Sequence, residues 1–154
     1  MANEPQPEPT IHDATGDDLA AAVALLRRQL DEHDIRLDDA ALAHAVRVLI
    51  EQPEVGRVLI ARCGGEIAGV AVLSFLWTLE HGGPAAWLDE LYVASAHRGR
   101  GIGRQLVEAA LQLARGRGCV ALDLEVEDGH EDAARLYARM GFTRHRRAHL
   151  VRKL

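Results

Sequence analysis

Several features that would mark a specialised class of protein are scarce in this sequence. It contains two cysteines among 154 residues, Cys63 and Cys119, which cannot form a disulfide framework and lack the spacing of metal ligands. No stretch approaches the roughly 20 continuous apolar residues that would span a bilayer, and no repeat of fixed period is present. We therefore predict a soluble, non-repetitive protein of a reducing compartment, with a cytoplasmic location as the default.

Positive charge is also in short supply. The chain carries 18 Lys and Arg against 23 Asp and Glu, which gives a formal net charge of −5. Such a balance disfavours a broad electrostatic grip on nucleic acid or on an anionic membrane surface. We expect neither as a partner, so any anionic ligand must be bound by a local cluster of positive groups.

Length and composition indicate one folded domain. The sequence is 48% hydrophobic and 27% charged, which is typical of a globular chain, and its length is close to the roughly 100–150 residues at which single domains are most common. Prolines recur within the first nine residues and disfavour a helix there. We predict a flexible tail at residues 1–9 and a single domain over residues 10–154.

Local signals predict the elements of this domain. Thr15, with Asp18 three residues on, resembles a capping box that opens a helix, Pro53 ends a second helix, and Gly64-Gly65 favours a hairpin turn between two apolar, β-branched-rich runs. The predicted strands are at residues 10–14, 55–62, 66–76, 86–93, 119–126 and 142–154, and the predicted helices begin at 15–18 and 38 and span 103–115 and 131–140. This order indicates a mixed α/β (α+β) domain with about four helices and a central, mostly antiparallel sheet.

A Gly- and Arg-rich loop lies between the predicted strand at 86–93 and the helix at 103–115. Its glycines allow a ligand close to the backbone, and the helix that follows points free N–H groups and the positive end of its dipole into the loop. Three guanidinium groups add charge that matches phosphate geometry. The residues concerned are Arg98, Gly99, Arg100, Gly101, Gly103 and Arg104. The pattern predicts a site for a phosphorylated cofactor.

Three other interpretations of this loop differ in how well they fit. A Walker A loop needs Gly-Lys-Ser/Thr, but the sequence here is Gly103-Arg104-Gln105, so nucleotide hydrolysis is disfavoured. A Rossmann loop needs a third glycine at position 104 or 106, which is absent, although Asp123 lies where a ribose-binding acid is expected. A plain glycine turn with solvated arginines is the third interpretation.

Two motifs together resemble the GNAT superfamily of N-acetyltransferases. The family signature Arg/Gln-x-x-Gly-x-Gly/Ala is matched by Arg98-Gly99-Arg100-Gly101-Ile102-Gly103. A second family pattern, Asn-x-x-Ala-x-x-hydrophobic-Tyr-x-x-x-Gly-Phe, is matched at Ala133, Leu136, Tyr137, Gly141 and Phe142, with His130 at the position of the usual Asn. The resemblance implies a GNAT fold over nearly the whole chain beyond the tail.

The resemblance also implies the mode of cofactor binding. Acetyl-CoA is expected as co-substrate, with its pantetheine arm along the strand before the loop and its diphosphate on the loop amides and Arg104. His130 could replace the contact that the family's Asn makes, because imidazole can donate or accept one hydrogen bond. The cofactor-binding residues implied are Leu91, Tyr92, Val93, Arg98, Gly99, Arg100, Gly101, Ile102, Gly103, Arg104 and His130.

The catalytic residues implied are one phenol and two carboxylates. Tyr137 is the expected general acid for the leaving thiolate, because a phenol with a pKa of about 10 can donate its proton as a thiolate with a pKa of about 8.5 forms. Asp89 or Glu90 is the expected base for the attacking ammonium group, and strand alternation allows at most one of them to point into a given cleft. The alternatives are a core aromatic for Tyr137 and plain surface acids for the pair.

The predicted function is transfer of an acetyl group from acetyl-CoA to a primary amine of a small molecule or peptide, by direct attack in a ternary complex. The alternative is a non-catalytic acyl-CoA sensor with the same fold. We predict no metal site, since no second histidine follows His130 at position 134. A homodimer is expected because many members of the family are dimers.

Overall fold

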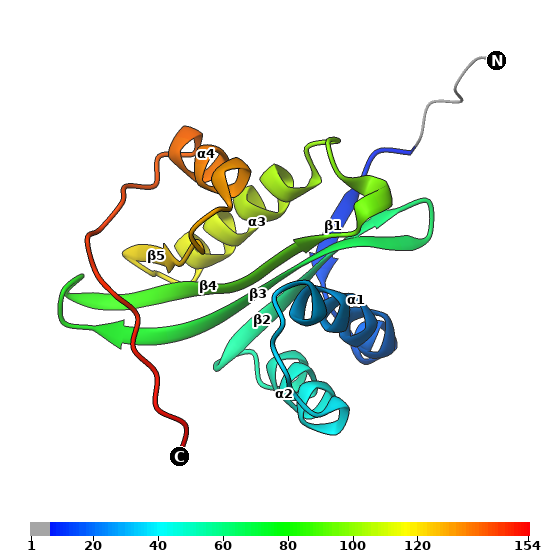
Figure 1. Ribbon diagram of the computed structural model, residues 1–154, viewed down its shortest axis with the longest axis horizontal. Helices are drawn as coiled ribbons and strands as arrows, with labels where there is room; N and C mark the ends of the chain where they lie inside the picture. Colours follow the sequence, from blue (N-terminus) through cyan, green and yellow to red (C-terminus); the bar gives the residue numbers. More distant parts are fainter. Residues whose placement is uncertain (1–6) are drawn as a thin grey trace.

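A computed structural model of the chain describes residues 7–154. A five-stranded sheet in the order β1-β2-β3-β4-β5 separates two layers of helices, with α3 and α4 on one face and α1 and α2 on the other (Figure 1). The elements are β1 (Thr10–Asp13), the 3-10 turn η1 (Gly16–Asp18), α1 (Leu19–Glu32), α2 (Asp39–Glu51), β2 (Gly56–Cys63), β3 (Glu66–Thr78), β4 (Gly83–Val93), the 3-10 turn η2 (Ser95–His97), α3 (Ile102–Gly116), β5 (Ala121–Leu124) and α4 (Glu131–Arg139). The predicted fold class is confirmed.

The sheet is antiparallel from β1 to β4 and parallel between β4 and β5. The hairpin between β2 and β3 turns at Gly64 and Gly65, whose φ angles of +58° and +96° lie in the region that glycine enters without a steric penalty. The parallel pair is joined through α3, as the strand, glycine loop and helix in the sequence indicate. The predicted hairpin is therefore confirmed.

Each face of the sheet has its own apolar core. On one face, α3 buries Ile102, Leu106 and Val107 against the strands. On the other, Leu25 and Leu26 of α1 are buried with side chains of α2 and of the strands. The two helices of each layer are therefore fixed to the sheet by apolar burial, which is the dominant favourable term in folding.

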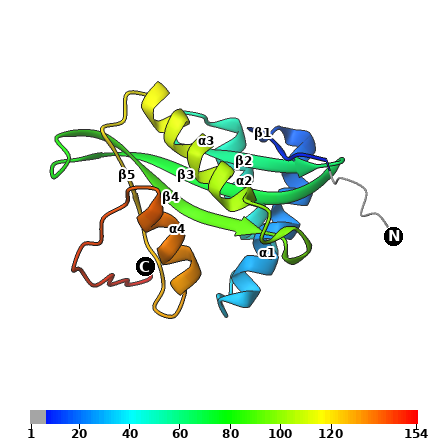
Figure 2. The ribbon, with the colours of Figure 1, turned by 90° about the horizontal axis from the view of Figure 1, so that it is seen from above.

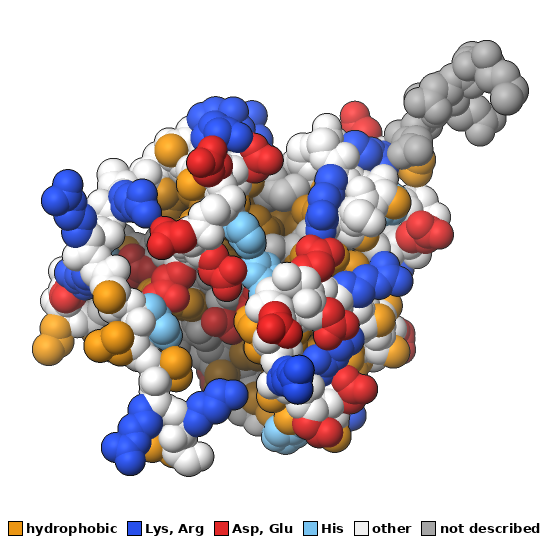
Figure 3. Space-filling model, in the orientation of Figure 1, with side chains coloured by type: hydrophobic (Ala, Val, Ile, Leu, Met, Phe, Trp, Pro, Cys, Tyr) orange, Lys and Arg blue, Asp and Glu red, His pale blue; other side chains and the backbone are white. Residues whose placement is uncertain are grey.

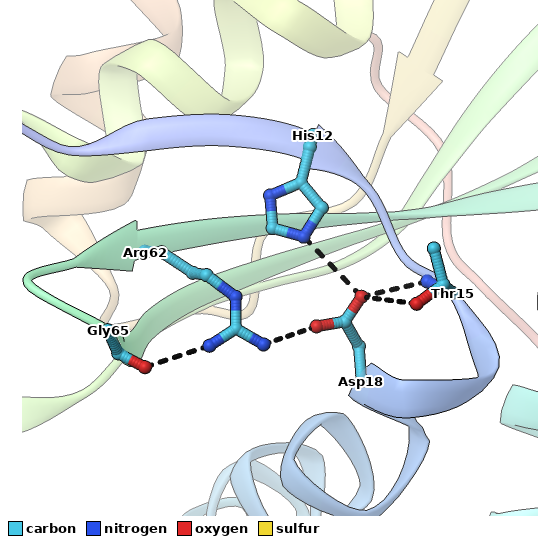
Figure 4. Close-up of polar contacts among 5 residues, drawn as sticks. All are labelled: His12, Thr15, Asp18, Arg62 and Gly65. Atoms are coloured by element: carbon cyan, nitrogen blue, oxygen red, sulfur yellow. Dashed lines mark hydrogen bonds and ion pairs between the residues drawn. The ribbon is translucent and has the colours of Figure 1, made fainter.

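A buried carboxylate joins the start of α1 to the sheet (Figure 4). Asp18 is 3% exposed and accepts hydrogen bonds from the backbone N–H of Thr15 at 2.8 Å and from the guanidinium of Arg62, which also donates to the carbonyl of Gly65. The imidazole of His12 lies 3.4 Å away. The capping box predicted at Thr15 and Asp18 is present, and it also reaches across to β2.

The end of the chain departs from the prediction. No strand forms over the predicted range 142–154; the segment runs as an irregular extended chain past the β3–β4 hairpin (Figure 1). Its side chains explain this, because charged and histidine residues interrupt the apolar ones and leave no alternating face to bury. Arg147 instead pairs with Glu80 at 2.6 Å, and Leu150 is 90% exposed. The prediction of a last strand is wrong.

The strand before α4 is also shorter than predicted. The sequence indicated a strand at 119–126, whereas β5 spans only Ala121–Leu124. Pairing with β4 stops after Leu124, and the chain then turns away toward α4. This shortening opens the sheet at the place where the functional residues are expected.

The N-terminal tail predicted at residues 1–9 lies partly outside the described residues, which begin at Pro7. Residues 7–9 have no regular structure, and the carbonyl of Pro7 accepts a hydrogen bond from Arg100 at 3.3 Å. Among the described helices, none is both long enough and apolar enough to cross a membrane.

Candidate active site

Strand β4 loses its partner halfway along its length. Ala85–Leu88 pairs with Ala121–Leu124 of β5, and in the described chain no strand continues this pairing along residues 89–93. Backbone groups on that edge of β4 are therefore available to a ligand. One of them, the carbonyl of Val93, accepts a hydrogen bond from Nε of Arg98 at 2.9 Å.

A cleft of about 970 Å³ opens beside this free edge. Its walls are the far end of β4, the loop that leads into α3, the first turns of α3, and one face of α4. The two helices lie next to each other over this part of the sheet in both ribbon views (Figures 1 and 2). The cleft thus brings the predicted pantetheine-binding strand and the predicted phosphate-binding loop into one site.

The glycine loop is shaped as an anion site. Gly99 and Gly101 have φ angles of +75° and +77°, and no other atom lies within 4 Å of where their Cβ atoms would stand. The glycines are therefore required by the backbone conformation, and the space beside them is open. The first bond that closes a turn of α3 runs from the N–H of Gln105 to the carbonyl of Gly101, so the preceding amides point into the loop without a helical partner.

The predicted arginines divide into two groups. Arg98 and Arg104 line the cleft, but Arg100 does not; its guanidinium instead contacts Nδ1 of His97 at 2.9 Å. Arg98 is held by β4 and by Glu32 of α1, 3.1 Å away. Of the three predicted guanidinium groups, that of Arg104 is paired only with a residue of its own helix, Glu108.

Two further arginines line the cleft from α4. Arg135 and Arg139 are one turn apart and face the loop across the opening. Arg135 is paired with acidic residues of its own helix, whereas Arg139 makes no ion pair with any described residue. Sequence reasoning missed both. The signal was their spacing of four residues on the helix that carries the second family motif.

Tyr137 lies on the buried face of α4. It is 8% exposed and packs edge-on against Phe142, with 5.6 Å between ring centroids. Burial raises the pKa of the Tyr137 phenol to about 12. Its hydroxyl makes no hydrogen bond with a described residue. The oxygen is not fully shielded, so solvent reaches it. The side chain is a core aromatic whose polar tip remains accessible.

The acidic pair sits at the point where β4 loses its partner. Leu73 of β3 lies opposite Leu88 while Val72 lies opposite Glu90, so Asp89 is the extra residue of a β-bulge. Glu90 is half-buried and accepts a hydrogen bond from Nε2 of Gln29 of α1. Burial raises the pKa of Glu90 to about 7, and the charges of Asp89 and Glu127 add to this while His33 opposes it.

Asp89 is less enclosed than Glu90. Its side chain is exposed, and burial of part of the carboxyl together with the charge of Glu125 raises its pKa. The bulge therefore separates the two acids: Glu90 turns toward α1, and Asp89 lies near the chain that follows β5. Sequence alternation predicted different directions for them, and it missed Gln29, which lies 61 residues away.

The side chains of two residues predicted to bind the cofactor lie away from the cleft. Tyr92 is buried on the α1 face, where its hydroxyl donates to Glu32 at 2.6 Å and its ring lies under the guanidinium of Arg98. His130, the residue before α4, does not line the cleft and packs edge-on against His33 at 5.0 Å. Tyr92 can serve a ligand only through its backbone.

The sequence matches a known protein family and several proteins of known function. Residues 19–142 match the sequence model of the acetyltransferase (GNAT) family. Streptothricin acetyltransferase of Streptomyces lavendulae is 39% identical over 83 residues, which are 51% of this chain and 39% of that protein. Mycothiol acetyltransferase of a Nocardioides species is 35% identical over 96 residues, 56% of this chain and 32% of that protein. The chain spans less than half the length of these curated relatives.

Solved structures match over nearly the whole chain. One is the crystal structure of a candidate acetyltransferase from Arthrobacter sp. FB24, whose sequence is 32% identical to this chain. Its TM-score is 0.78, and the match covers 94% of this chain and 96% of that one. An aminoglycoside N-acetyltransferase in complex with CoA has a TM-score of 0.83 at 19% identity over 99% of both chains, which shows a shared fold. With the family match over residues 19–142, these findings establish that the chain belongs to the acetyltransferase (GNAT) family.

Proposed function

We propose that this protein transfers the acetyl group of acetyl-CoA to a primary amine of a small molecule or peptide, by direct attack of the amine in a ternary complex. The observation that carries the proposal is the shared cleft, in which the free edge of β4 adjoins the anion-binding start of α3. The names of the relatives, streptothricin and mycothiol acetyltransferases, favour a small-molecule acceptor over a peptide.

The residues of the cleft fit CoA. The amides at the start of α3 can bind the diphosphate, and Arg104 and Arg139 are the guanidinium groups best placed to reach phosphate oxygens. The backbone of Leu91 and Val93 can pair with the amides of the pantetheine arm. Bound there, acetyl-CoA supplies an acetyl thioester, the activated acyl group of the reaction. Arg98 has its guanidinium engaged by Glu32 and by the carbonyl of Val93, so we assign it to holding the strand and loop together.

Glu90 is the proposed base. Its carboxylate contacts Gln29 of α1, on the opposite face of the sheet from α3 and α4, and neither Glu90 nor Asp89 lines the cofactor cleft. Glu90 lies just beyond the point where β4 stops pairing with β5, and we expect the acceptor to reach the thioester there. An amine entering from the α1 side meets this carboxylate before it meets the cofactor. A base with a pKa of about 7 can accept the ammonium proton near neutral pH, which is the range where general base catalysis is most effective.

Acidic charge on the α1 side supports a cationic acceptor. Figure 3 shows acidic side chains gathered around a hollow in the middle of one face. The pKa values of Asp89 and Glu90 are raised in part by neighbouring carboxylates, Glu125 and Glu127. A protonated amine is drawn into such a field. The acidic groups therefore serve attraction as well as proton removal.

Tyr137 is the proposed general acid. Its pKa of about 12 keeps the phenol protonated throughout the working pH range. Tyr137 itself does not line the cleft, but its neighbours Leu136 and Met140 do, and solvent reaches its hydroxyl. The phenol can donate its proton to the thiolate that leaves when the acetyl group is transferred. Its packing against Phe142 fixes the ring, so the same residue stabilises α4 and positions the proton.

Two measurements test this function. Calorimetric titration with CoA should show one site per chain, and a thiol-release assay with acetyl-CoA should identify an active amine among polyamines, aminoglycosides, amino acids and peptide N-termini. Binding of CoA without thiol release on any amine would favour the acyl-CoA sensor. Absence of CoA binding would overturn the cofactor assignment itself.

The homodimer implied by the family resemblance stays a prediction. Leu76, Trp77 and Leu79 are exposed at the tip of the β3–β4 hairpin, with exposed fractions of 39%, 80% and 101%, and an apolar tip of this kind suits a protein contact. Light scattering after gel filtration measures the mass directly. A dimer that becomes monomeric on substitution of Trp77→Ser would place the contact at this hairpin.

A further inference from the structure

Three potential metal ligands meet at the surface of the molecule, from segments that are far apart in sequence. His33 follows α1, and Glu127 and His130 lie between β5 and α4. One ligand atom from each lies within 4.8 Å of the other two, and Nδ1 of His33 is 3.0 Å from Oε2 of Glu127. Figure 3 shows histidine side chains beside acidic ones near the middle of the face. We call these residues the His33 cluster.

The chemistry of the His33 cluster selects the kind of ion. Imidazole nitrogen and carboxylate oxygen together suit Zn²⁺ and related transition metals, whereas Ca²⁺ and Mg²⁺ prefer oxygen ligands throughout. Two histidines and one glutamate form a set of three protein ligands that leaves a fourth position open. Bonds of about 2.0–2.2 Å would bring the ligand atoms closer together, and the exposure of Glu127 and His130 leaves their side chains room for this adjustment.

The surroundings of the cluster favour a cation, and an ion bound there would stabilise the fold. Glu90 lies close enough for its carboxylate to feel the charges of both His33 and Glu127. None of the three ligands lines the cofactor cleft, so an ion would not compete with CoA for side chains. It would instead join the end of α1 to the chain before α4, on the side where β4 and β5 diverge.

We propose that His33, Glu127 and His130 bind one divalent transition-metal ion of the Zn²⁺ class, which ties α1 to the segment before α4. Local spacing predicted no metal, because His33 lies 94 residues before Glu127 in the sequence. For the same reason, only the folded protein can present all three ligands. Binding should therefore raise thermal stability, since a ligand that binds the native state alone shifts unfolding.

The test is titration of Zn²⁺ into the full, tag-free chain after removal of metals by a chelator. Calorimetry should show one site per chain, and His33→Ala and His130→Ala should each weaken binding by about tenfold or more, because each removes one of three ligands. His44→Ala is the matched control, since His44 is exposed on α2 and outside the cluster. It should keep the wild-type affinity.

A melting measurement separates ligation from folding defects. Without zinc, His33→Ala, His130→Ala and Glu127→Gln should melt close to the wild type; with zinc, the wild type and His44→Ala should gain melting temperature and the three variants should gain less. Zinc binding that survives the loss of either histidine, as a site at Cys119 would, overturns the proposal. So does the absence of binding at micromolar zinc.

Discussion

The sheet has a closed side and an open side, and one strand belongs to both. Along its β3 edge, β4 is paired from Gly83 to Val93, while along its β5 edge it is paired only as far as Leu88. On the closed side, Ile60 and Leu73 are completely buried. On the open side, every residue of β5 is only half-buried. Strand β4 is therefore stabilised through one edge and exposes the other to ligands, so substitutions on the two sides should separate into effects on stability and effects on activity.

The largest effect should follow substitution of the proposed base on the open side. Glu90→Gln should lower kcat by about 10²–10⁴-fold, the usual contribution of general acid–base catalysis. It should also remove the rise in rate that we expect of the wild type as pH passes through about 7. Because folding raises the pKa of Glu90 from 4.5 to about 7, its ionisation costs stability as pH rises through that range. Glu90→Gln should therefore be as stable as the wild type, or more so, above pH 7.

Asp89→Asn is the matched control for the base. Asp89 is exposed on the bulge and does not turn toward α1, so its amide variant should lose much less activity than Glu90→Gln. Initial rates on the best amine across pH 6–9, with urea midpoints for stability, make the comparison. Equal losses from both variants would contradict the assignment of Glu90 and favour a role for the summed charge.

A pair of leucines on the same core tests the closed and open sides directly. Leu59 of β2 is 4% exposed, whereas Leu122 of β5 is partly buried against the same apolar cluster. Leu59→Ala should lower the free energy of unfolding by about 2–5 kcal/mol, the usual cost of deleting a buried leucine. Leu122→Ala should cost roughly 1 kcal/mol, since less apolar surface is lost. Denaturant unfolding measures both, and equal costs would mean that β5 is packed as tightly as β2.

Substitution of Tyr137, on the open side, should change the turnover more than the stability. Tyr137→Phe keeps the ring and its contact with Phe142 and removes only the hydroxyl. Turnover should fall by about 10²-fold, with the affinity for CoA and the melting temperature nearly unchanged. Wild-type turnover in this variant would show that water protonates the thiolate. A large loss of stability would favour the purely structural interpretation of Tyr137.

On the closed side, Asp18 should stabilise the fold over a defined pH range. Burial by itself raises its pKa, but the hydrogen bonds from Thr15 and Arg62 outweigh this and lower the pKa from 3.8 to about 2. A lowered pKa means that the ionised carboxyl stabilises the fold above about pH 4, and that this contribution is lost as pH falls toward 2. Asp18→Asn should therefore lower the free energy of unfolding by roughly 2 kcal/mol at pH 7.

The pH dependence distinguishes this ion pair from a simple packing defect. The difference between the wild type and Asp18→Asn in urea midpoint should narrow as pH falls from 5 to 2. Below about pH 4 the unfolded wild type binds a proton at Asp18, whereas the folded protein, in which the pKa of Asp18 is about 2, does not. A difference that stays constant over this range would show that the charge of Asp18 does not contribute. Activity per folded molecule should be unchanged, since neither Asp18 nor its partners Thr15 and Arg62 line the cleft.

The sequence predicted those parts of the fold that rest on local signals. The capping box at Thr15 and Asp18, the paired glycines at Gly64 and Gly65, and the glycine loop before α3 all act within a few residues, and each is present in the structure. The helices could be predicted because their apolar spacing depends on one face only. The strand predicted at 142–154 was wrong because charged and histidine residues leave this segment without an alternating apolar face to bury.

The site was predictable only as far as its motifs extend. The bulge at Asp89, which sets the directions of the two acids, depends on the register between β3 and β4. The contact of Gln29 with Glu90 and that of His33 with Glu127 join residues 61 and 94 positions apart. No local pattern encodes such pairs, because they arise from the packing of α1 against the open side of the sheet. The cleft arginines of α4 were missed for a similar reason.

The smallest effect should come from substitution of arginines on the open side, and it concerns the affinity for CoA. Arg139 lines the cleft without an ion-pair partner among the described residues, whereas Arg100 does not line it and instead contacts Nδ1 of His97 and the carbonyl of Pro7. Arg139→Gln should weaken CoA binding by roughly two- to fivefold, because an exposed charge pair contributes about 1 kcal/mol or less and each 1.4 kcal/mol is tenfold. Arg100→Gln should leave the affinity nearly unchanged.

Titration calorimetry at two salt concentrations measures both arginine variants. The wild-type affinity for CoA should fall as salt is raised, and it should fall less in Arg139→Gln, because salt screens a charge that this variant no longer has. A greater loss in Arg100→Gln than in Arg139→Gln would mean that the loop turns Arg100 into the cleft when CoA binds, releasing its contacts with His97 and Pro7. That outcome would assign the phosphate contact to the loop motif read from the sequence and not to α4.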